Sequence, residues 1–145
     1  MLGNGTVVLA DLNTSFGGND NAILYTDTTG SSWTLQTPQT LSDVHGPSSP
    51  PIVEGALTHD DVTYLFYKDY VYELEPNNPL GTIVAVYGIW EEIPRNIFVN
   101  APKGITGASE DYTYPLARMY RGFRWIYYNM ATSSILINSH GEMIP

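Results

Sequence analysis

The sequence predicts an all-β protein built from antiparallel hairpins, and two observations lead to this fold class. Turn-forming residues are dense, because the 145 residues include 13 glycines and 10 prolines, which leaves little room for helices of ordinary length. The segments between them are rich in Val, Ile, Tyr, Thr and Trp, which suit a pleated, half-buried surface. The best candidate for a helical turn is residues 116–121, where Pro115 could equally begin a loop.

The expected strands recur in the same order along the chain. A strand of small residues comes first, and it precedes a hairpin whose first strand carries tyrosine. The small-residue strands are expected at residues 7–11, 52–57 and 105–110, and the hairpins at 22–35, 62–75 and 125–137. In the first and third hairpins the paired strands are 22–26 with 32–35, and 125–129 with 135–137.

The hairpin at residues 62–75 is the clearest element. A two-residue turn at Lys68 and Asp69 sets the register of its two strands. The predicted pairs are Tyr67 with Tyr70, Leu65 with Tyr72, and Thr63 with Leu74. Both faces are then largely apolar, which places this hairpin between layers or between neighbouring blades.

The recurrence predicts a single all-β domain, residues 1–145, of three loosely similar repeats at about 5–50, 51–102 and 103–145. A period of roughly 40 to 55 residues is typical of the blades of a small β-propeller. Hairpins of any all-β protein also resemble one another, so a β-sandwich or jelly roll remains the alternative.

Residues 52–57, continuing into 64–72, resemble a hemopexin-like repeat, in which a blade opens with an acidic residue, two small residues and a large apolar one. Residues 89–94 look like the link that ends such a blade, and 120–125 like the turn before its aromatic strand. The likeness mainly covers residues 51–94. It implies a small β-propeller, although three repeats do not close a four-bladed ring.

A second likeness concerns residues 26–33, which look like a degenerate Asp-box hairpin of sialidase-like propellers, with Thr28 at the aspartate position. Both likenesses imply blades. Neither implies one ligand, since propeller families bind sugars, metals, polyamines and proteins.

Charge excludes several classes of partner. The chain has 15 acidic and 6 basic residues and a net charge of -9, with only a loose run of Arg118, Arg121 and Arg124, so nucleic acid is not an expected partner.

No segment reaches the ~20 apolar residues of a membrane span, and no membrane insertion is expected. The absence of cysteine leaves the redox compartment open. Residues 1–5 lack the features of a signal peptide, so we expect a mature form or a chain without a leader.

Aromatic residues are the strongest signal for function, with 11 Tyr, 3 Trp and 4 Phe. Most are expected in the core, but those at turns can offer a flat apolar face with a polar group to a ligand. The candidate ligand-binding residues are Trp33, Tyr70, Trp90 and Trp125, with Arg124 as a hydrogen-bonding partner. We therefore predict an extracellular or surface-exposed, lectin-like module that binds a carbohydrate or small ligand and needs no cofactor.

Catalysis and metal binding are not expected. Acidic pairs suited to glycoside hydrolysis cannot be assembled from the sequence, and the histidines lie apart and are read as loop residues. The acids considered are Asp11, Glu54, Asp60, Asp61, Glu91, Glu92, Glu110 and Asp111, and the histidines are His45, His59 and His140. Residues 11–20 alternate oxygen ligands, but an ordinary glycine-rich turn fits them better than a calcium loop. A glycosidase-like enzyme is the weakest alternative function.

A self-assembling structural subunit, forming a fibre, coat or ring, is the main rival. The low charged share and the two-sided apolar hairpin suit packing between chains, and a homo-oligomer is therefore expected as a partner. Asn4 and Asn13 stand in N-glycosylation acceptor patterns.

Overall fold

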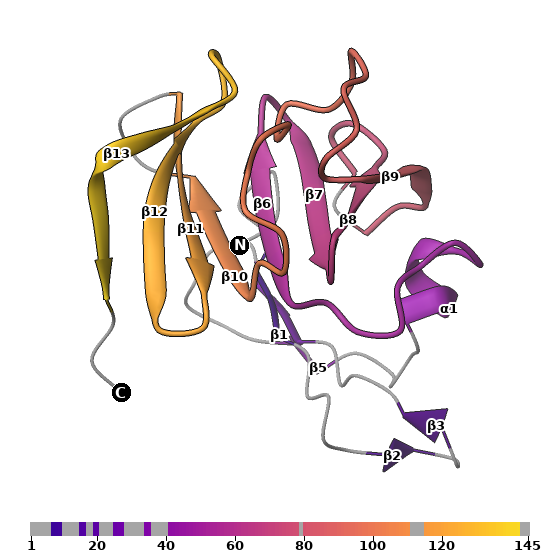
Figure 1. The fold of residues 1–145 in the computed structure, drawn as a ribbon. Coiled ribbons are helices and arrows are strands. Elements are labelled where there is room, and N and C mark those ends of the chain that lie inside the picture. Colours follow the sequence, from indigo (N-terminus) through magenta and orange to yellow (C-terminus); the bar gives the residue numbers. More distant parts are fainter. Residues whose placement is uncertain are drawn as a thin grey trace.

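The computed structural model describes the backbone of residues 7–9, 15–16, 19–20, 25–27, 34–35, 41–78, 80–110 and 115–142, and side chains in the parts of these ranges between 41 and 136. Strands dominate them, and α1 (Leu41–His45) is the single helix in these ranges (Figure 1). The all-β prediction is therefore confirmed. No helix of the described ranges is long and apolar enough to cross a membrane.

The first four-stranded sheet is antiparallel and contains β6 (Gly55–His59), β7 (Val62–Tyr67), β8 (Tyr70–Leu74) and β9 (Ile83–Gly88), in that order. The predicted hairpin register is confirmed, because Tyr67 pairs with Tyr70 and Leu65 with Tyr72. Lys68 takes a φ of 52° in the turn. Four consecutive residues of β7 are buried, so both faces of this hairpin are covered, as its two apolar faces predict.

The second sheet contains β10 (Gly107–Glu110), β11 (Leu116–Arg121), β12 (Arg124–Asn129) and β13 (Ser134–Glu142), again antiparallel and in chain order. The helical turn predicted at residues 116–121 is wrong, because this segment is β11. Ala117 and Met119 are buried while their neighbours are less so, and this alternation suits a strand paired on both sides.

Two further differences follow from the strand order. The strand β9 was not expected, although its run of Ile, Val, Ala, Val and Tyr suits a strand. Since β11 is the second strand of its sheet, residues 125–129 belong to the third strand and correspond to β8. The hairpin of the second sheet that matches residues 62–75 is therefore β11–β12. The division into three repeats within one domain stays a prediction.

The amino-terminal part contributes short strands. The strands β1 (Val7–Leu9), β4 (Tyr25–Asp27) and β5 (Thr34–Leu35) form a third antiparallel sheet in the order β1-β4-β5. They overlap the strands expected at 7–11, 22–26 and 32–35. Residues 11–20 include the antiparallel pair β2 (Ser15–Phe16) and β3 (Asn19–Asp20).

The hydrophobic core lies between the two four-stranded sheets, which stand side by side (Figure 1). Leu57 and Phe66 enter it from the first sheet, and Met119 and Tyr128 from the second, all at most 1% exposed. Phe98, in the link between β9 and β10, also belongs to this core and is fully buried. One continuous core thus joins both sheets.

The link holds Phe98 in place through Asn96. The buried Asn96 amide donates hydrogen bonds to the carbonyl groups of Ile89 at 3.0 Å and Glu91 at 2.8 Å. Its side-chain oxygen accepts the Phe98 N–H at 2.9 Å. These hydrogen bonds satisfy backbone groups of the link, so this irregular segment can lie against the buried core.

The two sheets approach one another through glycines of their first strands. A Cβ atom on Gly55 of β6 would lie 3.1 Å from the Gly107 Cα and 3.3 Å from the Ala108 backbone nitrogen of β10. No side chain larger than hydrogen fits at Gly55 without a shift of the β10 backbone. Residue size at this point therefore sets the distance between β6 and β10.

The short helix α1 places His45 against the first sheet. The helix ends at Gly46, whose φ of 91° and N–H to the Ser42 carbonyl at 2.9 Å form a left-handed cap. His45 is 7% exposed, and its Nδ1–H donates to the Gly81 carbonyl at 2.7 Å. Burial lowers the pKa of His45, and this effect is larger than that of the hydrogen bond to Gly81, which raises it. The pKa of His45 therefore lies below its ordinary value.

This burial predicts an acid-sensitive contribution to stability. As the pH falls through about 6.5, the unfolded chain takes up a proton at His45 that the folded chain still resists, so the free energy of unfolding falls. The loss at this site is at most about 1.4 kcal/mol per pH unit. We expect urea unfolding between pH 8 and 5 to show a steeper loss in the wild type than in His45→Asn, which keeps a hydrogen-bond donor that does not titrate. Equal slopes would contradict the assignment to His45.

Candidate functional site

Two of the predicted binding residues meet at the end of the first sheet. Tyr70 opens β8 opposite Gly88, and Trp90 lies two residues after the end of β9. Their rings lie edge to face with centroids 5.5 Å apart, and both side chains are exposed, at 43% and 46%. The ammonium group of Lys103 lies 5.3 Å from the Trp90 ring, within the range of a cation–π contact.

The Trp90 ring is held flat over a glycine. A Cβ atom on Gly88 would lie 2.4 Å from the indole, so the ring occupies the space that any other residue would fill. The Glu91 carboxylate accepts the Gly88 N–H at 2.5 Å, which ties the strand end to the following turn. The exposed aromatic pair is therefore supported by the backbone beneath it.

A pocket of about 160 Å³ lies beside the β11–β12 hairpin of the second sheet. Its floor is apolar, with Ile105 and Met119 at 1% exposure, and Trp125 is among its lining residues. Arg121 and Arg124, both exposed, border it. The complete lining is Pro102, Ile105, Met119, Tyr120, Arg121, Arg124, Trp125 and Ile126.

Arg118 positions the Trp125 ring. Its guanidinium carbon lies 4.9 Å from the centroid of Trp125 and 5.1 Å from that of Tyr127, and the guanidinium donates to the Tyr127 hydroxyl at 2.5 Å. The two rings meet edge to face at 5.3 Å. Hydrogen bonds with the Tyr127 and Tyr120 hydroxyls raise the pKa of Arg118, so the cation between the rings is permanent.

The loop before β10 connects the aromatic pair with the pocket. Pro102 lines the pocket, while the next residue, Lys103, contacts Trp90. Gly104 turns the chain with a φ of 72° and passes the Arg121 side chain, whose Nε would lie 3.9 Å from a Cβ at this position. The two groups of candidate residues thus flank one short loop and form one extended surface.

The structure brings four of the five predicted ligand-binding residues onto this surface: Tyr70, Trp90, Arg124 and Trp125. Trp33 lies outside the described residues, as do Asn4 and Asn13. Sequence reasoning missed Arg121, Tyr120 and Lys103. The missing signal was β11, because recognising that strand would have placed Arg121 directly across the hairpin from Arg124.

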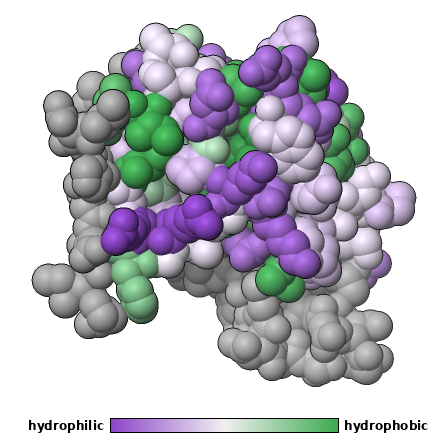
Figure 2. All heavy atoms as spheres, in the orientation of Figure 1, coloured by the Kyte–Doolittle hydropathy of each residue, from purple (hydrophilic) through white to green (hydrophobic). Residues whose placement is uncertain are grey.

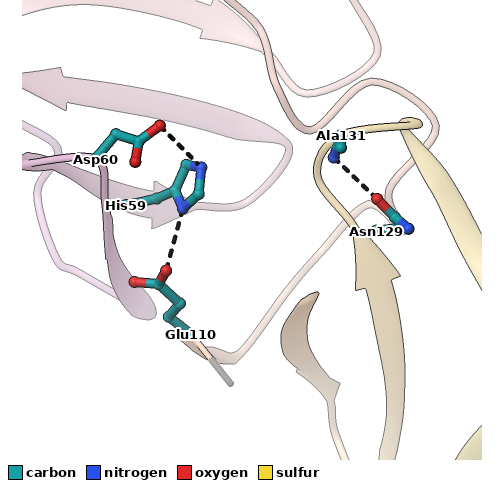
Figure 3. Close-up of polar contacts among 5 residues, drawn as sticks. All are labelled: His59, Asp60, Glu110, Asn129 and Ala131. Atoms are coloured by element: carbon teal, nitrogen blue, oxygen red, sulfur yellow. Dashed lines mark hydrogen bonds and ion pairs between the residues drawn. The ribbon is translucent and has the colours of Figure 1, made fainter. Parts of the chain in front are cut away.

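A second cluster joins the sheets at His59, the last residue of β6 (Figure 3). Its Nδ1 lies 3.2 Å from a Glu110 carboxylate oxygen at the end of β10, and its Nε2 lies 3.4 Å from Asp60. The side chain is 7% exposed, so this contact fastens β6 to β10 within the structure. In the second sheet, the Asn129 side chain accepts the Ala131 N–H at 2.9 Å and closes the turn after β12 (Figure 3).

The reading of the histidines as loop residues is wrong. His45 is the last residue of α1, His59 is the last residue of β6, and His140 lies in β13. In the part of the chain that the structure describes, no three His, Cys, Asp or Glu side chains are arranged to hold a metal ion.

Four of the acids considered for catalysis have structural contacts. Glu54 accepts the Lys68 N–H at 2.6 Å and closes the turn between β7 and β8. Glu91 accepts the Gly88 N–H beside the aromatic pair. Asp60 and Glu110 bind His59, and Asp11 and Asp111 lie outside the described residues.

Comparison with known proteins adds information about the fold. No family model matches the chain, and no curated protein matches its sequence. Among solved structures, a hemopexin fold protein, CP4 from cow pea, superimposes with a TM-score of 0.66 at 12% identity, covering 99% of this chain and 65% of that one.

Two structures from Cicer arietinum are also similar. One is a plant albumin showing hemagglutination, with a TM-score of 0.58, 15% identity, and coverage of 84% of this chain and 62% of that one. The other is a plant lectin with two metal binding sites, with a TM-score of 0.53, 15% identity, and coverage of 86% and 60%. The chain thus spans less than two thirds of each of these proteins. Its similarity to the hemopexin fold supports the predicted resemblance at the level of architecture.

Proposed function

We propose that the chain is an extracellular binding module, and not an enzyme, which holds a ring of a carbohydrate ligand in the pocket beside the β11–β12 hairpin. The observation that carries this proposal is the pocket itself, which combines an apolar floor with two bordering guanidinium groups and has Trp125 among its lining residues. A few placed polar groups around an apolar pocket are typical of ligand sites. A sugar ring offers an apolar C–H face to such a floor, and its hydroxyl groups accept hydrogen bonds from arginine.

The fold similarities support the same class of function. One protein of similar fold is described as a lectin, and another as an albumin showing hemagglutination. Pocket size narrows the mode of binding, because about 160 Å³ is less than the roughly 300–1,000 Å³ of sites for drug-sized ligands. The pocket therefore takes one ring, and further rings of an oligosaccharide extend toward Trp90 and Tyr70.

The test is a glycan array followed by calorimetric titration of the best ligand. Trp125→Ala removes a lining residue of the pocket and the ring that contacts Arg118, so we expect its Kd to rise about tenfold or more, which is about 1.4 kcal/mol. Phe123→Ala is the matched control, since Phe123 is 62% exposed on the same hairpin but does not line the pocket, and its Kd should stay unchanged. A chain that binds no glycan on the array, or a Trp125→Ala variant with full affinity, contradicts the proposal.

Self-association is the second candidate, favoured by strand β9 at the edge of the first described sheet. Its outward side chains Val84 and Val86 are 48% and 44% exposed, and an edge strand with apolar side chains is a template for pairing with another copy. Figure 2 shows hydrophobic side chains on one face in separate patches divided by hydrophilic residues. We expect light scattering at rising concentration to show a mass above 16.1 kDa if β9 pairs, while a constant monomer mass removes this candidate.

A further inference from the structure

We infer that the ligand of the pocket is an acidic saccharide, whose anionic group binds to Arg121. The inference rests on the proposed function and names its ligand class. The shared chemistry is an oxyanion on a sugar ring, either the carboxylate of a uronic acid or a sulfate ester.

The distribution of positive charge is the first observation. The chain carries 6 basic residues against 15 acidic ones, and most of the basic residues gather around this one surface. Arg121 and Arg124 line the pocket, Arg118 contacts the ring of the lining residue Trp125, and Lys103 follows the lining residue Pro102 in the chain. Only Lys68 and Arg95 lie elsewhere in the sequence. At physiological salt, charges beyond about 8 Å are largely screened. A ligand in the pocket is therefore affected more by these nearby positive side chains than by the negative net charge of the whole chain.

The register of the hairpin is the second observation. Arg121 and Arg124 are direct cross-strand partners at the ends of β11 and β12, so two guanidinium groups stand together at the border of the pocket. An oxyanion bound to Arg121 accepts charge-assisted hydrogen bonds from its guanidinium group.

The composition of the pocket lining is the third observation. Among the described residues that line it, none is Asp or Glu. We assign the anion to Arg121, the last residue of β11. Arg121 is exposed at the rim, while the apolar floor of Ile105 and Met119 lies below it. This arrangement fits a ring that is apolar on one face and carries its charge at the edge.

The experiment compares three ligands of equal length by calorimetric titration: a galacturonic acid trimer, a neutral galactose trimer and a sulfated galactose trimer. We expect the wild type to bind one of the acidic trimers about tenfold or more tighter than the neutral one, and the ratio to shrink as salt is raised from 0.05 to 0.5 M, because screening weakens the charge contact. The tighter acidic trimer identifies carboxylate or sulfate as the anion.

Arg121→Gln should bring the ratio of acidic to neutral affinity close to one, and Arg121→Lys should keep part of it. Lys68→Gln removes a cation from the equivalent turn of the first sheet, outside the pocket lining, and should leave every affinity unchanged. Equal binding of acidic and neutral trimers by the wild type overturns the inference and leaves the proposed function standing. A ratio that Arg121→Gln does not alter also overturns it, and no binding of any saccharide overturns both.

Discussion

Replacing Phe98 by alanine is expected to lower the free energy of unfolding by about 3–5 kcal/mol, the cost typical of removing a buried phenylalanine ring. Phe98 is fully buried between the two four-stranded sheets. Its ring lies 4.9 Å from Tyr64 and 5.1 Å from Phe66, both edge to face, and 6.5 Å from Tyr128 of the second sheet. One substitution therefore opens a cavity shared by both sheets.

Urea unfolding followed by tryptophan fluorescence measures this loss. Phe98→Leu is the control, because it refills much of the volume and should cost clearly less than Phe98→Ala. The change also tests the architecture, since a ring that joins two sheets should lower the stability of both together. A loss below about 1 kcal/mol, or two separate transitions of which only one shifts, would show that Phe98 does not join the sheets.

Replacing Gly55 by alanine is expected to cost about 1–3 kcal/mol, as typical of overpacking. The new methyl group would meet backbone atoms of β10 at 3.1 to 3.3 Å, and backbone moves less readily than the end of a side chain. The effect arises from close approach between strands rather than from strain in φ, because Gly55 is not among the residues with positive φ in the described ranges.

Gly107→Ala is the matched control for this prediction. It lies across the same contact, but its new methyl group would meet only the Tyr120 side chain, at 3.5 Å or more, which is ordinary van der Waals distance. We expect it to be neutral or to stabilise by about 0.4–1 kcal/mol, because alanine restricts the unfolded chain. Thermal unfolding of the two variants side by side measures the contrast. Equal midpoints would contradict the close packing of β6 on β10.

The predicted carbohydrate surface combines residues from both sheets. The sequence could therefore indicate its individual residues but not their grouping. Turn chemistry and aromatic composition identified Tyr70, Trp90, Arg124 and Trp125 as exposed candidates, since rings near turns are less easily buried. Their grouping needed the loop of Pro102 and Lys103, which contacts both parts. No spacing in the sequence encodes that contact.

The bonds of His59 illustrate the same limit. His59 and Glu110 are 51 positions apart and meet because β6 and β10 lie side by side. Within one strand the sequence shows only that neighbouring side chains point to opposite faces. The histidine therefore looked isolated until the two sheets were placed together.

Local interactions explain what the sequence by itself determined: the all-β class, the hairpin at residues 62–75 and its register, because turn residues and strand periodicity act over a few positions. The same local reasoning failed at residues 116–121, where a helical turn was expected but pairing with β10 and β12 produces a strand. Tertiary structure alone decided the packing of β6 against β10, the burial of Phe98 between the sheets, and the position of Arg121 at the border of the pocket beside β11 and β12. These features depend on contacts between segments far apart in the chain, whose free energy is realised only when both sheets are assembled around one core.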